Sequence, residues 1–195
     1  MSCPDCKAGT ILEGEPTGVI SNIDGAYLAA APEPTTKRAV LLFTDAFGLP
    51  LVNSRLIADS YAKKLSCDVW IPDIFAGKPL IGVDQIEMQR RAGEKRPFLS
   101  LIRFYLSMIP SIPALIASRP AVVDKRLTAF IAKLQAEKQY EQIGAFGFCY
   151  GGSTACRMAG TDLLKSAVIC HPGPVGLDTI KAIKIPVSWV CAEGT

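Results

Sequence analysis

The chain has 195 residues, of which 49% are hydrophobic and 20% charged, and its formal net charge is +3. This composition is typical of a folded globular protein, and the length is sufficient for one domain with a substantial core. The small, scattered positive charge argues against nucleic-acid binding. No apolar stretch approaches the roughly 18 residues that would predict a membrane-spanning helix.

The first residues contain a Cys-x-x-Cys pair, Cys3 and Cys6, but no basic and apolar signal-peptide pattern. With no such signal, the odd number of seven cysteines predicts free thiols in a reducing, cytoplasmic compartment. A structural zinc site needs four ligands, and no second close pair accompanies Cys3 and Cys6. The sequence also lacks a phosphate-binding glycine loop, so we predict neither a metal nor a cofactor.

In chain order, the first predicted elements are a hairpin and two buried strands. Residues 19–20 and 26–31 are expected to pair across the Asp24-Gly25 turn. The apolar runs at 39–44 and 68–72 are typical of strands that are covered on both faces.

Between those two runs the sequence predicts a helix that begins at Asn53, as the capping residue, and ends near Leu65. Leu56, Ile57, Tyr61 and Leu65 recur at helical spacing, and we expect them to form its buried face.

The later elements complete an alternation of helices and strands. They are helical runs at 84–93 and 98–108, a helix at 122–138, a strand at 143–148, a helix opened by residues 151–153, a strand at 166–170, a short helix at 178–181 and a strand at 187–192. This alternation predicts a doubly wound, mostly parallel α/β sheet within one domain, residues 1–195.

The most informative motif joins the strand at 143–148 to the helix that follows. Gly147, Cys149 and Gly151 have the Gly-x-nucleophile-x-Gly spacing of a nucleophile elbow. The nucleophile of such an elbow occupies a strained turn, and glycines two residues before and after it relieve crowding because they lack Cβ. The alternative interpretation is a structural cysteine in a glycine-rich turn.

Five segments, spread along nearly the whole chain, are informative when they are taken together. They are GEPTG at 14–18, TDAFG at 44–48, WIPDIF at 70–75, GFCYGG at 147–152 and CHPG at 170–173. Together they resemble the dienelactone hydrolase family, a branch of the α/β-hydrolases with a cysteine nucleophile. The resemblance implies the α/β-hydrolase fold and the hydrolysis of a cyclic lactone or another small ester.

The resemblance also implies roles for individual residues. Cys149 would attack the carbonyl carbon, and the backbone N–H groups of Ala46 and Tyr150 would stabilise the oxyanion. Asp45 stands where the family has a glutamate that regulates the nucleophile, so it either modulates the thiol or only caps its own loop. Phe47 is expected to line the substrate pocket.

The rest of a catalytic triad is not evident. In α/β-hydrolases the nucleophile is followed by an acid and then a histidine, but the single histidine, His171, directly follows the next strand. We expect it to line the pocket, with service as the base as the alternative. The family's acid position would fall at about Thr195, with Glu193 as a weaker substitute. We therefore expect a C-terminally shortened chain that lacks the last strand or strands, the final helix and the triad Asp and His.

Two hypotheses follow. The first is a hydrolase that cleaves a lactone or small ester through a cysteine acyl-enzyme. The second is a catalytically weak or inactive relative that binds a ligand or partner. A shortened sheet would leave an exposed edge, which fits a monomer or a homodimer. Lys78, Arg91 and Arg103 could attract an acidic lactone or could simply be solvated.

Overall fold

The computed structural model describes residues 11–33, 37–82 and 112–191. Its strands form one sheet in the order β1-β2-β4-β3-β5-β6-β7. Their bounds are β1 Val19–Ile20, β2 Tyr27–Ala29, β3 Arg38–Phe43, β4 Asp68–Ile71, β5 Gln142–Phe148, β6 Ser166–Cys170 and β7 Val187–Val190. The pairs β1–β2 and β2–β4 are antiparallel, and the remaining pairs are parallel. The predicted hairpin and the mostly parallel sheet are confirmed.

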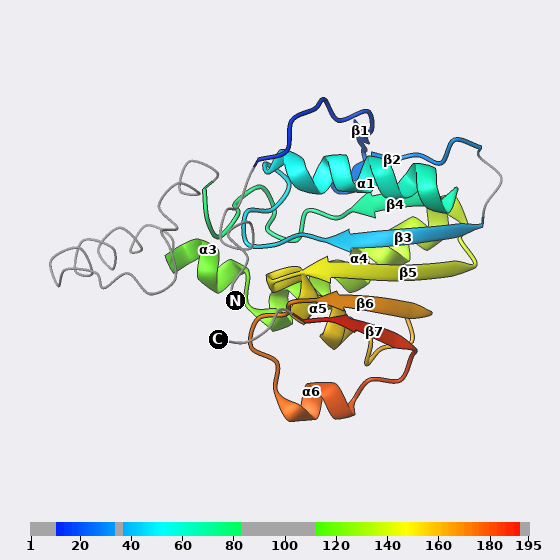
Figure 1. Ribbon diagram of the computed structural model, residues 1–195. Helices are drawn as coiled ribbons and strands as arrows, with labels where there is room; N and C mark the ends of the chain where they lie inside the picture. Colours follow the sequence, from blue (N-terminus) through cyan, green and yellow to red (C-terminus); the bar gives the residue numbers. More distant parts are fainter. Residues whose placement is uncertain (1–10, 34–36, 83–111, 192–195) are drawn as a thin grey trace, which may run out of the picture.

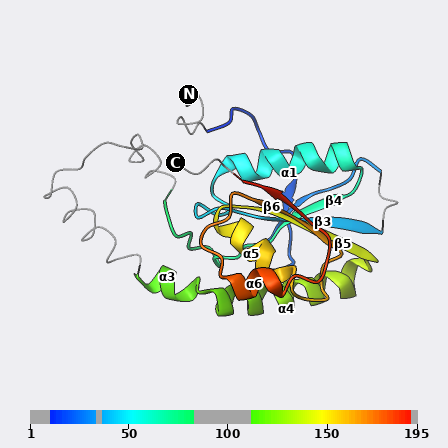
Figure 2. The same ribbon diagram turned by 60° about the horizontal axis from the view of Figure 1, so that its bottom comes forward.

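Helices cover both faces of this sheet, as the doubly wound prediction requires. Their bounds are α1 Val52–Leu65, α3 Ile112–Ala117, α4 Pro120–Lys138, α5 Tyr150–Met158 and α6 Leu177–Lys181. Helix α1 lies on one face, and α4, α5 and α6 lie on the other (Figures 1 and 2). None of the helices in the described ranges is long and apolar enough to cross a membrane.

Several predictions fall outside the described residues and stay predictions. They concern the cysteine pair at 3 and 6, the helical runs at 84–93 and 98–108, the basic residues Arg91 and Arg103, and the acid position near Glu193 and Thr195.

The central strands are buried on both sides, which explains their continuous apolar sequence. In β3, Leu41 and Phe43 belong to the core under α4 and α5, whereas Leu42 belongs to the core under α1. All three are 0% exposed. Side chains alternate between the two faces of a strand, so only a strand covered on both faces needs an unbroken run of apolar residues.

The predicted cap of α1 is wrong, and its predicted buried face is right only in part. Leu51 is the capping residue and makes no side-chain cap, whereas Asn53 lies inside the helix and accepts the Leu12 N–H at 2.8 Å. Leu56 and Ile57 are half-buried, and Ile57 packs against the core. Tyr61 and Leu65 are 41% and 45% exposed, although the Tyr61 ring lies on Phe146 of β5 with centroids 5.0 Å apart.

The fully buried positions of α1 are held by small and polar side chains: Ser54, Ala58, Asp59 and Ala62. The two alanines have little bulk, so the helix can lie close to the sheet. Asp59 is buried because its carboxylate accepts hydrogen bonds from the Thr17 N–H at 2.6 Å and the Tyr27 hydroxyl at 2.8 Å.

The side of the sheet formed by β6 and β7 is less covered. Val168 in β6 is 37% exposed, and Trp189 and Val190 in β7 are 40% and 55% exposed. Among the described strands, β7 pairs with β6 alone.

Candidate active site

Cys149 lies in the turn between β5 and α5, with φ 52° and ψ −110°. A positive φ is costly for a residue with a side chain and persists only when the surrounding structure enforces it. Here the peptide is held on both sides: the Cys149 N–H donates to the Cys170 carbonyl at 3.2 Å, and the Cys149 carbonyl accepts from the Ser153 and Gly173 N–H groups, each at 3.1 Å. The Cys149 side chain is exposed.

Three glycines make this turn possible. A Cβ on Gly147 would lie 2.1 Å from the Gly151 carbonyl oxygen, and one on Gly151 would lie 2.0 Å from the Phe43 carbonyl oxygen. A Cβ on Gly152 would lie 2.6 Å from the Cys170 carbonyl oxygen. Backbone therefore fills the space on each side of the elbow, which is the crowding that the Gly-x-Cys-x-Gly spacing predicts.

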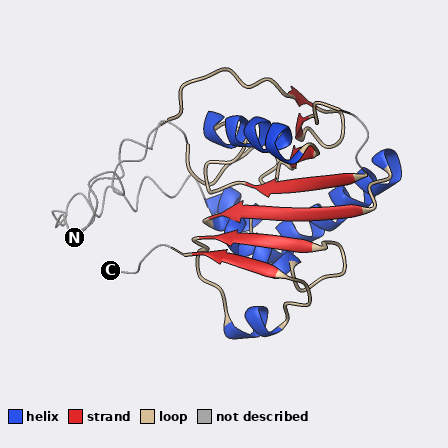
Figure 3. Ribbon diagram, turned by 45° about the vertical axis from the view of Figure 1, so that its right-hand side comes forward, coloured by secondary structure: helices blue, strands red, loops and turns tan. Residues whose placement is uncertain are grey.

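The loop after β3 comes next to the elbow because β3 pairs with β5 in parallel, with Phe43 opposite Gly147. The parallel strands end at the same edge of the sheet (Figure 3). In the described part of the chain, neither the Ala46 N–H nor the Tyr150 N–H donates to a protein acceptor. Tyr150 begins α5, where the first N–H groups have no partner within the helix. Tyr150 directly follows Cys149, and the loop that contains Ala46 begins at Phe43, which pairs with Gly147 of the elbow.

Asp45 caps its own loop. Its Oδ1 accepts the Phe47 N–H at 2.9 Å, and its carbonyl accepts the Gly48 N–H at 3.2 Å. Burial raises the pKa of the Asp45 carboxyl, and these N–H groups and the nearby His171 oppose that rise in part. Within the described ranges, no hydrogen bond joins the Asp45 carboxylate to the Cys149 thiol.

His171 follows β6 with φ 32°. Its N–H donates to the Val190 carbonyl at 2.7 Å, and its ring stacks on Phe148 with centroids 6.0 Å apart. Since β3, β5 and β6 pair in parallel, His171 and Asp45 follow strands that end at the same edge of the sheet, and His171 opposes part of the rise in the Asp45 pKa. Phe47 is half-buried in the loop after β3.

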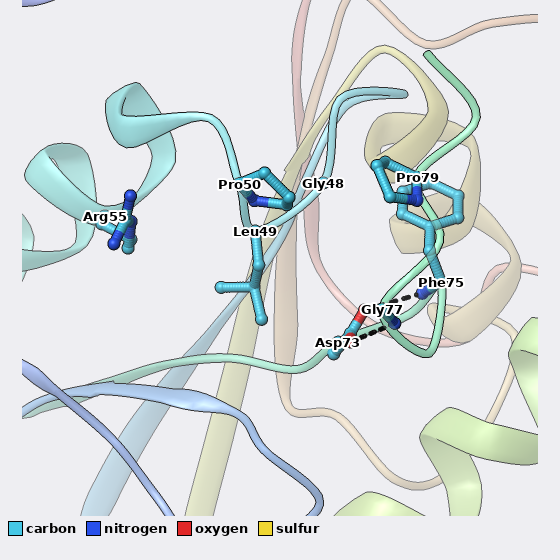
Figure 4. A pocket seen from close by; sticks show the side chains of 8 residues that line it. All are labelled: Gly48, Leu49, Pro50, Arg55, Asp73, Phe75, Gly77 and Pro79. Atoms are coloured by element: carbon cyan, nitrogen blue, oxygen red, sulfur yellow. Dashed lines mark hydrogen bonds between the residues drawn. The ribbon is translucent and has the colours of Figure 1, made fainter. Parts of the chain in front are cut away.

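A cavity of about 210 Å³, which the sequence analysis did not identify, lies beside this loop (Figure 4). It is lined by Gly48, Leu49, Pro50, Arg55, Asp73, Phe75, Gly77 and Pro79. Phe75 also packs against Tyr150, with ring centroids 5.2 Å apart, so one wall of the cavity touches the elbow. Three of the lining residues belong to segments that carry the family resemblance, Gly48 to TDAFG and Asp73 and Phe75 to WIPDIF, but neither segment by itself predicts a cavity.

Two charged side chains line this cavity. The carboxylate of Asp73 accepts the Phe75 and Gly77 N–H groups, at 3.1 and 2.6 Å, so it organises the loop after β4. The Nε of Arg55 is buried and has no acceptor among the residues that the structure describes.

Comparison with known proteins agrees with the fold. Hydrolase pyvD of Aspergillus violaceofuscus is 30% identical over 185 residues, which cover 94% of this chain and 66% of that protein. Hydrolase tropI of Talaromyces stipitatus is 26% identical over 197 residues, which cover 98% of this chain and 70% of that protein. The chain therefore spans about two thirds of the length of these relatives.

Among solved structures, the crystal structure of a dienelactone hydrolase from Anabaena variabilis superposes with a TM-score of 0.52 at 14% identity. The match covers 84% of this chain and 65% of that one. At this identity the likeness shows the fold alone. The family model of the dienelactone hydrolase family matches residues 25–194. The chain belongs to the dienelactone hydrolase family.

Proposed function

We propose that this protein is a hydrolase that cleaves a small ester or lactone through a thioester formed on Cys149. The observation that carries the proposal is the exposed Cys149 side chain, which a positive-φ turn holds at the start of α5. The Tyr150 N–H directly follows it, and the loop with Ala46 begins at the same edge of the sheet, which supports a role for both N–H groups. Two of its relatives are named hydrolases, which favours this function over that of a non-catalytic binding protein.

In the proposed reaction the Cys149 thiolate forms a bond from Sγ to the carbonyl carbon, and the carbonyl π electrons move onto oxygen. The Ala46 and Tyr150 N–H groups donate to that oxyanion. Preorganised donors of this kind typically lower the activation free energy by about 3 kcal/mol. Collapse of the intermediate breaks the carbon–oxygen bond, and the alkoxide leaves and takes a proton. Water then attacks the thioester and releases the carboxylic acid and the thiol.

We assign the supporting roles as follows. Asp45 holds the loop that presents the Ala46 N–H and, when ionised, opposes the formation of a thiolate nearby, because like charges repel. Phe47 and His171 line the substrate pocket. The substrate is a small molecule, and the chain's own residues supply the proposed acylation chemistry with no cofactor.

Turnover of p-nitrophenyl acetate tests the proposal. Cys149→Ala is expected to reduce hydrolysis to the uncatalysed background. Cys191→Ala is the matched control, because Cys191 is also an exposed thiol, and it should leave the rate within about twofold of wild type, as expected for a surface position. Equal hydrolysis by Cys149→Ala and wild type would contradict the proposal.

A further inference from the structure

The residue after Cys149, Tyr150, is anchored from outside its own turn. Its hydroxyl donates to the carbonyl of Ser118, which precedes α4, and its own carbonyl accepts from the Thr154 hydroxyl at 3.0 Å. Burial raises the pKa of the Tyr150 phenol, so the hydroxyl keeps the proton that it donates. Tyr150 is therefore fixed at both its side chain and its backbone.

Arg157, at the end of α5, extends this arrangement to α4. Its Nε lies 3.0 and 2.9 Å from the two carboxylate oxygens of Asp124, and its Nη2 donates to the Thr154 hydroxyl at 3.1 Å. The side chains of Asp124 and Arg157 are only 32% and 19% exposed. A shielded, hydrogen-bonded pair of this kind holds its geometry better than an exposed ion pair does.

Hydrogen-bond chemistry gives this network a direction. A guanidinium can only donate, so the Thr154 hydroxyl accepts from Arg157 and its single proton is left for the Tyr150 carbonyl. Thr154 is 0% exposed, so no water competes for that proton. The charge on Arg157 thus orients a hydroxyl that lies one turn closer to the elbow.

The first turn of α5 needs such support. It contains Gly151 and Gly152, and glycine is about 1 kcal/mol less favourable than alanine in a helix. The capping residue, Cys149, makes no side-chain cap. The residues of the turn that presents the Tyr150 N–H therefore stabilise a helix only weakly by themselves.

We propose that Asp124 and Arg157 are positioning residues: together with Thr154 they form an α4–α5 clamp that holds Tyr150, and with it the N–H aimed at the oxyanion. The inference rests on the proposed function, because it assigns the clamp to acyl transfer. It predicts that the clamp matters for reactions that pass through an oxyanion, and much less for other reactions of the same thiol.

Two reactions of Cys149 distinguish a clamp that positions the oxyanion donor from one that only supports the turn. Acetylation by p-nitrophenyl acetate passes through a tetrahedral oxyanion, whereas alkylation by iodoacetamide displaces iodide without one. Arg157→Gln is expected to slow acetylation about tenfold, less than the roughly 100-fold or greater loss on removing an oxyanion donor outright. Its alkylation rate should stay within about twofold of wild type. Arg157→Lys keeps the positive charge but lacks the planar guanidinium group. Its acetylation rate should therefore lie between those of wild type and Arg157→Gln.

Lys133→Gln is the matched control, since it removes another ion pair of α4, with Asp24 at 2.5 Å, far along the helix from the elbow. It should change neither rate. Arg157→Gln that acetylates as fast as wild type would overturn the inference. So would an equal loss of acetylation and alkylation, because Arg157 would then support the whole turn. A wild-type protein in which Cys149 is not acetylated faster than Cys191 would instead overturn the proposed function, and the role of the clamp with it.

Discussion

The elbow and the β6–β7 side of the sheet are held in different ways. Strand β5 pairs along its length with both β3 and β6, and backbone atoms pack directly against the glycines that flank Cys149. Strand β7 pairs with β6 alone among the described strands, and Trp189 and Val190 remain largely exposed. Local stability follows burial and pairing, so we expect the elbow to be the more rigid region.

This difference shows which elements fix the backbone conformation of the proposed nucleophile, Cys149. The Cys149 turn is constrained by β3, β5 and β6, which are neighbouring strands of the described sheet, and by α5, which packs against them. Little of that constraint comes from β7. The turn that holds the proposed nucleophile is therefore fixed by the central strands and by α5 rather than by β7.

Of the predicted changes, a methyl group added at Gly151 of the elbow should have the largest effect on folding stability. Gly151→Ala places a Cβ 2.0 Å from the Phe43 carbonyl, where backbone must move, so we expect a loss of about 3 kcal/mol of folding free energy or more. Gly176→Ala is the matched control, because nothing lies within 4 Å of its Cβ. Urea unfolding measures both. Equal stability of the two variants would contradict the described packing.

A smaller effect concerns Asp45 and pH. Because burial raises its pKa, the folded protein binds this proton more tightly than the unfolded chain does. The carboxyl's contribution to stability is therefore present in acid and is lost as pH rises above the usual aspartate range, about 4. Asp45→Asn keeps an oxygen to accept the Phe47 N–H and should be more stable than wild type at pH 7, by less than about 1 kcal/mol.

Thermal unfolding of both proteins across pH 4 to 7, roughly the span above the ordinary carboxyl pKa, checks this sign. The difference in Tm should shrink as the pH falls. A difference that grows toward acid would mean that the folded protein favours the ionised carboxylate. Alkylation of Cys149 at pH 7 should also be faster in Asp45→Asn, and an unchanged rate would leave Asp45 as a loop cap only.

Local sequence patterns predicted most of the fold. The apolar runs located β3, β4, β5 and β6, and the glycine spacing located the turn at Cys149, because each of these features depends on neighbours in the sequence. The face of α1 was right only in part: Ile57 packs against the core and the Tyr61 ring lies on Phe146 of β5, but the fully buried positions are held by small and polar residues. That choice is made by tertiary contacts such as the one between Asp59 and Tyr27.

The parts of the site that sequence analysis missed depend on distant residues. Asp124 and Arg157 lie 33 residues apart, and either one alone reads as a solvated charge on a helix. The cavity beside Arg55 joins loops after two different strands. Neither feature has a pattern along the chain, so each becomes visible only when the strands are assembled.

The most direct test compares the two thiols that are exposed among the described residues, Cys149 at the elbow and Cys191 just after β7. The protein is treated with substoichiometric p-nitrophenyl acetate, and peptide mass mapping locates the acetyl group. We predict a thioester on Cys149 at least about tenfold more abundant than on Cys191, because the proposed oxyanion donors, the Ala46 and Tyr150 N–H groups, would serve Cys149 and not Cys191. Equal acetylation of the two cysteines would contradict the claim that the elbow is built for acyl transfer.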